Sequence, residues 1–456
     1  MNAEPFRFSV ILVLLLQVLP WQTAAGADAD AFLDLAEDAG RWIASTAIPI
    51  DHCNVWPDDA MAPDKIGYDL ASGVAGKVVF FVALHRATGD DAYLDAARCG
   101  ADFLVDVLDD PARFDGDPRR ASLYAGVAGI GVALLHVAGE VDDDIYDEAL
   151  QRIFDKLVDW VVRDADGVHW SERFNDLLYG DAGTVLFLAQ LAEHTGNAFA
   201  LNLARVGAHS LLKQAIDDGN TRHWLFRRDK PFNLPNFSHG TAGVAYVLAT
   251  VGSMTGDDMY LDAAKSGFRY LRSVAEIEND QLRIPYGWGA DHWQGLYEFG
   301  WAHGLTGSAL LLLRLQDLDI ETTDATRYLD LTRNTLTSID LPGTPAEPFA
   351  EPSTPLDFRF GRAGVLSLAC YWAEKFPDDP KVRRLCTDLY GHIATAAIRE
   401  NDTAYWPVDA PAFMGGGRAA YTGLFHGAAG IGLALLSAHA DLTENLRYDN
   451  LPDDPR

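Results

Sequence analysis

Residues 73–84 read GVAGKVVFFVAL, a Gly-x-x-Gly element that opens a run of apolar residues. The same kind of element recurs six more times along the chain. The seven glycine pairs are Gly73/Gly76, Gly126/Gly129, Gly180/Gly183, Gly240/Gly243, Gly304/Gly307, Gly361/Gly364 and Gly427/Gly430. The first glycines lie between 53 residues (Gly73 to Gly126) and 66 residues (Gly361 to Gly427) apart. That spacing fits a helical hairpin with its connections, repeated seven times.

Each repeat is expected to hold one buried inner helix and one amphipathic outer helix. The segments 73–84 and 427–436 are apolar on nearly every side, which is typical of a helix that is buried all round. Three repeats then carry a helix stop followed by a restart, in which glycine ends one helix and Asp or Asn begins the next. These are Thr88-Gly89-Asp90, Thr195-Gly196-Asn197 and Thr255-Gly256-Asp257. The segments that follow, such as 93–97 and 260–264, mix apolar and charged residues, as outer helices with one solvated face do.

Seven hairpins of this kind can close into a double ring, which removes the need for capping repeats. We therefore predict an all-α fold, an (α/α) toroid of seven helical hairpins with seven inner and seven outer helices. It should span residues 28–440, followed by a loose polar tail at 441–456. The glycines, which lack a side chain, would let backbones crowd together near the ring axis.

The charge of the chain excludes some classes of partner. Asp and Glu number 66 against 36 Lys and Arg, which gives a net charge of −30. The acidic residues are spread along the chain, so nucleic acid and anionic lipid are not expected as partners. The same acid excess fits either adaptation to high salt or an ordinary acidic protein.

The first 27 residues resemble a secretory signal. Arg7 precedes an apolar stretch at 8–19, and the small residues 24–27 follow it. The apolar stretch is too short to span a membrane comfortably, although an uncleaved N-terminal anchor is the alternative. We expect a periplasmic or secreted protein with no stable membrane span after signal cleavage.

The cysteines do not have the spacing of a metal site. The chain has four of them, Cys53, Cys99, Cys370 and Cys386. None of them forms a C-x-x-C element or a Cys/His pattern. Disulfide pairing and buried free thiols both remain open for them.

Candidate functional residues lie just before the glycines. All inner helices of such a ring begin at the same end, so the loops that precede them gather around the axis; we call this end the mouth. Immediately before the first glycine, three of the seven repeats carry histidine: His239, His303 and His426. Either they share a function, or each imidazole caps a helix or fills a polar gap.

A second repeat position carries short polar side chains. Four residues before the first glycine stand Asp69, Asp176, Asn236 and Asp357. Capping of the helix entry would explain each of them singly. Asp176, however, lies one repeat before His239, and a carboxylate beside an imidazole makes an acid/base pair. Asp176, His239 and His303 are therefore the candidate catalytic residues.

An aromatic loop at 286–298 should overhang the mouth. It carries Trp288, Asp291, His292 and Glu298. Exposed aromatic faces suit sugars or extended peptides, with the polar groups as contacts. Alternatively, these rings pack the loop onto the helices.

Four strings of the sequence resemble the lanthionine synthetase C-like (LanC-like) family. They are NDLLYGDAG (175–183), SHGTAG (238–243), GWAHGLTG (300–307) and FHGAAG (425–430), and the resemblance covers nearly all of the chain after the signal segment. It implies a double ring of seven inner and seven outer helices. Family cyclases add cysteine thiols to dehydrated serine or threonine in peptides, using a zinc ion held by two cysteines and one histidine.

The resemblance carries over the acid and the histidine but not the zinc cysteines. The family's histidine falls on His239 and its acidic residue on Asp176. Its first cysteine falls on Ala302, and its Cys-His pair falls on Arg359 and Phe360, or on Phe425 and His426 if the last repeat is matched. By this pattern no metal is expected, unless His239, His303 and His426 rebuild a zinc site. The resemblance and the loops together give a set of ligand-binding candidates: Tyr179, Trp288, Asp291, His292, Trp301, Arg359 and His426.

Three functions fit these observations. The first is an exported LanC-like protein that acts on or binds a peptide or similar polar ligand in the central cavity. The second is a carbohydrate-active (α/α)-barrel enzyme for glycan hydrolysis, lysis or epimerisation, which would use Asp176, Asp357, Asp291 and Trp288. The third is a non-catalytic binding module.

Overall fold

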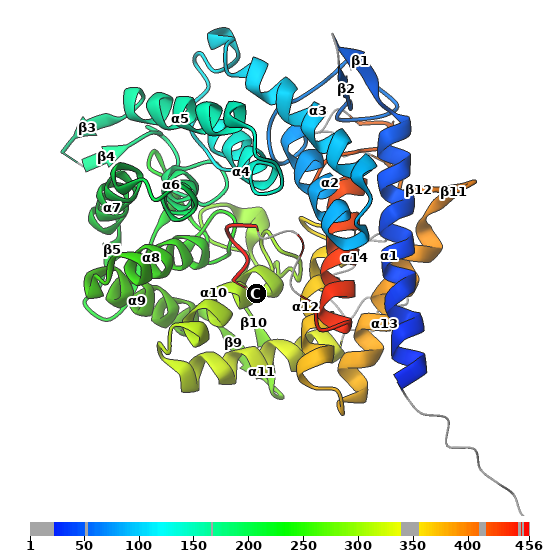
Figure 1. The fold of residues 1–456 in the computed structure, drawn as a ribbon. Helices are drawn as coiled ribbons and strands as arrows, with labels where there is room; N and C mark the ends of the chain where they lie inside the picture. The colour runs from blue at the N-terminus through cyan, green and yellow to red at the C-terminus, as the bar shows by residue number, and fades with distance from the viewer. Residues whose placement is uncertain are drawn as a thin grey trace, which may run out of the picture.

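The computed structural model describes residues 22–50, 53–165, 167–338, 355–409, 416–445, 448 and 451–455. Within them, fourteen α-helices form two concentric rings (Figure 1). The inner helices are α2 (Val74–Thr88), α4 (Val127–Ala138), α6 (Asp181–Thr195), α8 (Thr241–Thr255), α10 (Leu305–Asp317), α12 (Arg362–Lys375) and α14 (Ala428–Leu442). The outer helices are α1 (Gln22–Ser45), α3 (Asp91–Val107), α5 (Asp144–Asp159), α7 (Ala198–Lys213), α9 (Asp258–Val274), α11 (Thr322–Ser338) and α13 (Pro380–Ala396). The expected (α/α) toroid with seven helices in each ring is confirmed.

The seventh hairpin is built from the two ends of the chain. Each of the inner helices α2 to α12 packs against the outer helix that follows it, whereas α14 packs against α1, the first helix of the chain (Figure 1). The N-terminal helix therefore completes the outer ring next to the last inner helix. It begins at Gln22, and the signal segment expected before it, residues 1–21, lies outside the described residues.

The second glycine of each pair lets neighbouring repeats approach closely. A Cβ added at Gly129 would lie only 2.8 Å from the Cβ of Leu70, which stands three residues before the first glycine of the preceding repeat. Five of the other second glycines face the Cβ of the corresponding residue in their own preceding repeat, and Gly364 faces the backbone nitrogen of that residue, Trp301. Gly76 faces Leu424, which joins the seventh repeat to the first. A side chain at these positions would push the inner helices apart.

A closed belt of backbone hydrogen bonds surrounds the axis at the mouth. In each repeat, the N–H of the residue two positions before the first glycine donates to the carbonyl of the equivalent residue in the next repeat. The seven bonds run Ala71→Tyr124 (3.1 Å), Tyr124→Leu178 (3.2 Å), Leu178→Ser238 (3.1 Å), Ser238→Ala302 (3.0 Å), Ala302→Arg359 (2.8 Å), Arg359→Phe425 (3.2 Å) and Phe425→Ala71 (2.8 Å). The belt satisfies backbone groups that would otherwise be buried without partners. It also holds the residue that follows, immediately before each first glycine, at a fixed height around the axis.

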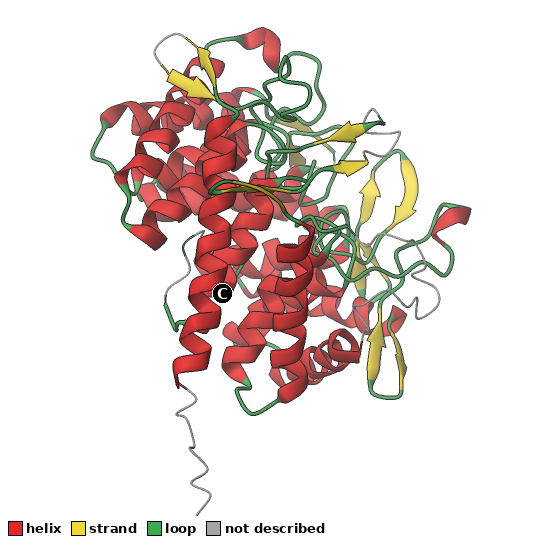
Figure 2. Cartoon of the chain, turned by 90° about the vertical axis from the view of Figure 1, so that its right-hand side faces the viewer, coloured by secondary structure: helices red, strands yellow, loops and turns green. Residues whose placement is uncertain are grey.

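Short antiparallel hairpins are gathered at one end of the double ring (Figure 2). All of them lie in connections from an outer helix to the next inner helix, so they surround the mouth. They pair β1 (Ile48–Ile50) with β2 (Cys53–Val55), β3 (Val162–Asp164) with β4 (Gly167–His169), β5 (Ile216–Asp217) with β6 (Arg222–His223), β7 (Leu225–Arg227) with β8 (Lys230–Asn233), β9 (Glu276–Glu278) with β10 (Gln281–Arg283), β11 (Ile398–Glu400) with β12 (Thr403–Tyr405), and β13 (Val408–Asp409) with β14 (Arg418–Ala419).

The end of the chain differs from the loose tail that we expected. Residues 451–455 return into the ring, where the C-terminal trace lies among the inner helices (Figure 1). Leu451 and Asp453 are buried, and the Tyr124 hydroxyl donates to Oδ2 of Asp453 at 2.7 Å. The Tyr246 hydroxyl donates to the Pro452 carbonyl at 3.3 Å. The polar composition of this segment predicted an exposed tail. Its polar groups are buried instead, because tyrosine hydroxyls inside the ring donate hydrogen bonds to them.

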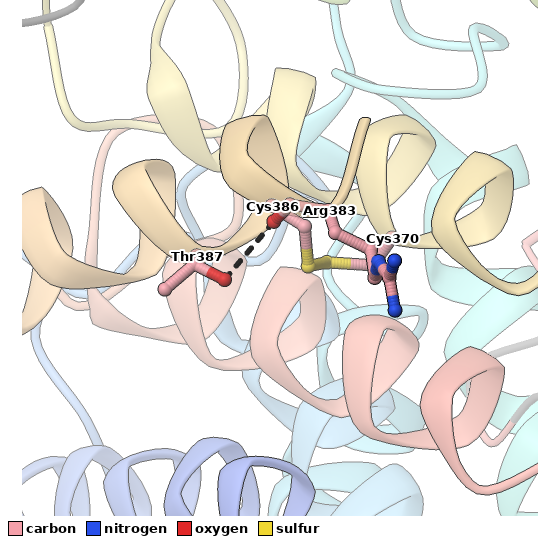
Figure 3. The surroundings of a disulfide bond; sticks show 4 residues. All are labelled: Cys370, Arg383, Cys386 and Thr387. Carbon is pink, nitrogen blue, oxygen red and sulfur yellow. Dashed lines mark hydrogen bonds between the residues drawn. A yellow bond between two sulfur atoms is a disulfide. The ribbon is translucent and has the colours of Figure 1, made fainter. Parts of the chain in front are cut away.

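Two of the four cysteines are joined. Cys370 of α12 and Cys386 of α13 form a disulfide that links an inner helix to its outer partner (Figure 3). Cys53 and Cys99 are free. No helix among the described residues is long and apolar enough to cross a membrane.

Candidate functional site

Asp176 and His239 form the acid/base pair that the sequence predicted. One carboxylate oxygen of Asp176 contacts Nδ1 of His239 at 2.6 Å, and the carboxylate also accepts from the Tyr179 backbone N–H at 3.3 Å. Capping and pairing with histidine are therefore combined in one side chain. Both side chains are buried. Burial raises the pKa of Asp176 well above its ordinary value, whereas burial and then the Arg359 cation lower the pKa of His239 well below its own.

Asn236 and His303 repeat this arrangement one unit further along the chain. Oδ1 of Asn236 accepts from the His239 backbone N–H at 3.0 Å, which fixes the orientation of the amide. Its Nδ2 group therefore points at Nδ1 of His303, at 3.0 Å. Burial lowers the pKa of His303 well below its ordinary value, and the neighbouring His239 and Arg359 lower it further. Both imidazoles are neutral at neutral pH.

The two partners select opposite tautomers of the two imidazoles. Backbone N–H donors and the Arg359 cation favour the ionised form of Asp176. As a carboxylate it only accepts, so Nδ1 of His239 carries the proton and its Nε2 has the lone pair. An amide N–H only donates, so Nδ1 of His303 accepts and its Nε2 carries the proton. The Arg359 Nη2 group lies 3.4 Å from Nε2 of His239, as a donor to that lone pair, and the Tyr286 hydroxyl lies 3.3 Å from Nε2 of His303. The ring centroids of the two histidines are 5.3 Å apart, so the site places a proton acceptor beside a proton donor.

A third pair, Asp357 and His426, lies apart from the first two. Oδ2 of Asp357 contacts Nδ1 of His426 at 2.9 Å, and Oδ1 accepts from the Phe360 backbone N–H at 2.8 Å. The Phe360 ring lies between His303 and His426, with its centroid 5.5 Å from the first imidazole and 5.6 Å from the second. The structure therefore brings His239 and His303 together, and the Phe360 ring separates His426 from them. Among the described residues, no three His, Cys, Asp or Glu side chains are arranged to hold a metal ion.

The residues at the family's zinc-ligand positions do not fit a zinc ion. Ala302 is buried and has no donor atom, and Phe360 offers only a ring. The guanidinium of Arg359 lies 3.4 Å from the imidazole nitrogen of His239 that would face a metal. A fixed cation beside that nitrogen opposes the binding of a second cation. The chemistry of this site therefore has to be derived from its own side chains.

Two further polar groups of the site have atoms without a partner. Nε of Arg359 and Oε2 of Glu298 are buried and make no hydrogen bond. Burial raises the pKa of Glu298 to about 7; Arg359 acts to lower it and Asp357 acts to raise it. Unpartnered buried polar atoms are rare in folded proteins and call for an explanation such as a ligand.

The predicted ligand-binding residues are divided by the structure into three locations. Tyr179 packs beside His239, with ring centroids 5.3 Å apart, and Arg359 and His426 lie at the mouth as described above. Trp288 and Asp291 are exposed on the rim. The backbone of Trp288 is hydrogen-bonded to that of Asn233. Asp291 begins a short 3₁₀ helix that also contains His292. Trp301 is buried beneath the belt against Tyr124 and Phe425, so it supports the site rather than facing a ligand.

Sequence reasoning missed several residues that complete the site. Asn236 appeared only as a cap, Glu298 and Tyr286 appeared only as parts of the rim loop 286–298, and Phe226, whose ring lies 4.5 Å from His239, was given no role. One signal was available for Asn236. The residue four positions before a first glycine always reaches the histidine of the next repeat, as Asp176 does with His239. The other three residues come from loops whose paths over the mouth no repeat pattern specifies.

Comparisons with known proteins identify the family. The model of the lanthionine synthetase C-like protein family matches residues 64–338. Among solved structures, nisin cyclase resembles this chain with a TM-score of 0.56 and 14% identity, covering 92% of this chain and 95% of nisin cyclase. Cellobiose 2-epimerase from Spirochaeta thermophila DSM 6192 resembles it with a TM-score of 0.50 and 11% identity, covering 93% of this chain and 99% of the epimerase.

At these identities the two structures show a shared fold and nothing finer. A comparison with curated protein sequences gives no match. The family model, however, spans more than half of the chain and includes Asp176, Tyr179, His239 and His303. The chain therefore belongs to the lanthionine synthetase C-like family.

Proposed function

We propose that this protein is an acid–base enzyme of the LanC-like family that moves a proton within a peptide or similar polar substrate, without a zinc-bound thiolate. The observation that carries this proposal is that Nδ1 contacts a carboxylate in His239 and an amide N–H in His303, which assigns opposite tautomers to the two imidazoles. Nε2 of His239 is a base backed by Asp176, and Nε2–H of His303 is a donor set by Asn236. A general base and a general acid of this kind each contribute about 10²–10⁴-fold to a rate.

The chemistry suited to this geometry is proton transfer at a carbon next to a carbonyl. His239 takes the proton through Nε2, the electron pair of the broken C–H bond forms a carbon–carbon double bond, and the π pair of the carbonyl moves onto its oxygen. Donors from His303 and Arg359 stabilise that oxygen, as donors placed where negative charge develops do. Return of the proton to carbon, on the same or the opposite face, completes an isomerisation that needs no other reactant.

A peptide is the first choice of substrate, because the chain belongs to the lanthionine synthetase C-like family and the cyclases of that family act on peptides. A carbohydrate is the second choice, and Glu298 favours it. A carboxyl with a pKa of about 7 that lies within electrostatic reach of Asp357 suits the acid role in glycan chemistry. The exposed ring of Trp288 at the rim suits either class of ligand.

Export and metal independence are parts of the same proposal. The disulfide between Cys370 and Cys386 supports a periplasmic or secreted location, because disulfides persist in oxidising compartments. The Arg359 cation beside His239 supports chemistry without zinc. Metal content of the protein, purified without a His-tag or chelator, tests the second point: one zinc per chain that is lost in His239→Ala would contradict it.

Solvent exchange tests the function even before a substrate has been identified. The protein is incubated in D₂O with separate panels of peptides and of reducing oligosaccharides, and deuterium at carbon is read by mass spectrometry. We expect exchange in one panel by the wild type, and its loss in His239→Gln and in His303→Gln. Exchange in neither panel, or exchange that both variants retain, would contradict the proposal and favour a binding module.

A further inference from the structure

Arg359 differs from other arginines at the mouth in its contacts. Arg119, Arg227 and Arg228 form ion pairs with Asp117, Asp229 and Asp181, respectively. The guanidinium of Arg359 instead contacts an uncharged imidazole, at 3.4 Å from Nε2 of His239, and its Nε is buried without a hydrogen-bond partner. In a chain of net charge −30, a half-buried guanidinium whose Nε faces no acceptor is unusual, because buried charges are normally paired.

The surroundings of Arg359 hold its guanidinium in place. The guanidinium carbon lies 4.6 Å from the centroid of the Phe360 ring and 5.1 Å from that of Phe425. The backbone of Arg359 is part of the belt, donating to the Phe425 carbonyl and accepting from Ala302. Cation–π contacts of this kind orient a guanidinium without using its N–H donors. The donors therefore remain available in a fixed direction.

Glu298 supplies the second half of the site. It comes from the loop before α10 and lies within electrostatic reach of both Arg359 and Asp357. Its Oε2 is buried and, like Nε of Arg359, has no hydrogen-bond partner. With its proton in place, the carboxyl offers one O–H donor within electrostatic reach of the guanidinium. Nε–H of Arg359, and the carboxyl of Glu298 when it is protonated, can both donate to an acceptor on a ligand.

We propose that Arg359 and Glu298 form a subsite for a carboxylate group of the ligand, seated beside His239. The Asp176 carboxylate is bonded to His239 rather than to the guanidinium, so the unpartnered Nε–H of Arg359 remains available to a carboxylate of the ligand. A guanidinium binds a carboxylate through two parallel N–H···O bonds, which also fixes the ligand's orientation. The inference rests on the proposed function only for the statement that the bound carboxylate lies next to a reacting carbon.

Two kinds of ligand could bring a carboxylate to this site. A carboxylate reaches the site either as part of a peptide, at its C-terminus or on an acidic side chain, or as the acid group of a uronic sugar. The probes are therefore an N-acetylated dipeptide with a free C-terminus and glucuronate, each compared with its neutral methyl ester. Binding to the full chain is measured by saturation-transfer NMR, so that weak ligands are detected.

The variants separate this site from other cations of the mouth. Arg359→Gln removes the charge and the forked donors, and Arg359→Lys keeps the charge alone. Arg227→Gln is the matched control, because Arg227 lies at the same end of the ring and is already paired with Asp229. Melting temperatures of all three variants show whether each one folds.

We expect at least one acid to bind about tenfold or more tightly than its ester, as a charged hydrogen bond of about 1.5–3 kcal/mol implies. That preference should disappear in Arg359→Gln, weaken in Arg359→Lys and persist in Arg227→Gln. Equal binding of acid and ester, no binding of either acid, or a preference that Arg359→Gln retains would overturn the subsite. Acid binding without any deuterium exchange would overturn the proposed function and leave the subsite standing, whereas exchange without a preference for acids would do the reverse.

Discussion

The side-chain amide of Asn236 donates to Nδ1 of His303 at 3.0 Å, in the position where Asp176 accepts from Nδ1 of His239. The two pairs therefore differ in one atom: the atom that contacts the imidazole is an amide nitrogen in Asn236 and a carboxylate oxygen in Asp176. The same repeat position holds both side chains, so the chain offers two nearly isosteric exchanges, Asn236→Asp and Asp176→Asn.

Each exchange should reverse the tautomer of one histidine. Asn236→Asp keeps the oxygen that accepts from the His239 backbone, so the loop should remain folded, but it moves the His303 proton to Nδ1. Asp176→Asn should move the His239 proton to Nε2. Either change should lower the exchange rate by about 10²-fold or more, because the acid or the base is lost. Histidine ¹⁵N shifts report the tautomer directly, and a variant with a reversed tautomer and a wild-type rate would contradict the assignment of roles.

The second glycine of a repeat should not tolerate a side chain. A Cβ at Gly243 would lie 2.0 Å from the Phe237 carbonyl oxygen and 3.1 Å from the Leu177 Cβ. Gly243→Ala should therefore lower the free energy of unfolding by about 2–3 kcal/mol. Gly391→Ala is the control, because Gly391 lies in α13 with nothing near its added Cβ. That variant should gain up to about 1 kcal/mol, and similar urea midpoints for the two variants would contradict the packing described here.

The C-terminal segment should stabilise the ring through Tyr124. A hydrogen bond between a hydroxyl and a buried carboxylate contributes about 1.5–3 kcal/mol. Tyr124→Phe and Asp453→Asn should each lower the free energy of unfolding, and the double variant should cost less than the sum of the two. A coupling energy near zero in this cycle would mean that the segment contributes little inside the ring.

The disulfide should stabilise the pairing of α12 with α13. Cys370 and Cys386 are separated by 16 positions in the sequence, and closing a loop of that length stabilises a protein by about 3 kcal/mol in the chain-entropy model. Reduction should lower the melting temperature of the wild type but not that of a Cys370→Ser/Cys386→Ser variant. A Cys53→Ser variant controls for the free thiols and should respond to reduction as the wild type does.

Glu298 should make stability depend on pH. Burial raises the pKa of Glu298 to about 7 from an ordinary 4.5. The folded state therefore holds this proton more tightly than the unfolded chain, so the resulting stability is full below pH 4.5 and is lost as the pH rises towards 7. Across that window the wild type should lose up to about 3 kcal/mol relative to Glu298→Gln. Urea unfolding of both proteins at several pH values measures this, and a constant difference between them would contradict the burial of the carboxyl.

The repeats made the ring and part of the site predictable from sequence. Seven glycine pairs specified the inner helices, and the residue before each first glycine placed His239 and His303 at the mouth. The pairing of α1 with α14 was not predictable, because α1 carries no Gly-x-x-Gly element and its partner lies at the other end of the chain. His426 is separated from the other two histidines because the intervening repeat places Phe360 between His303 and His426, an order that the repeats already specify. The burial of Asp453 depends on the Tyr124 hydroxyl, a contact between distant parts of the chain.

The protonation and tautomer of His239 and His303 distinguish the assigned base from the assigned acid. Long-range ¹H–¹⁵N NMR spectra of histidine-labelled protein, assigned with His239→Gln and His303→Gln, give the charge and the tautomer of each ring. We expect both rings to be neutral at neutral pH, with the proton on Nδ1 of His239 and on Nε2 of His303. Two rings in the same tautomer, or a positively charged His239, would contradict the assignment of one base and one acid.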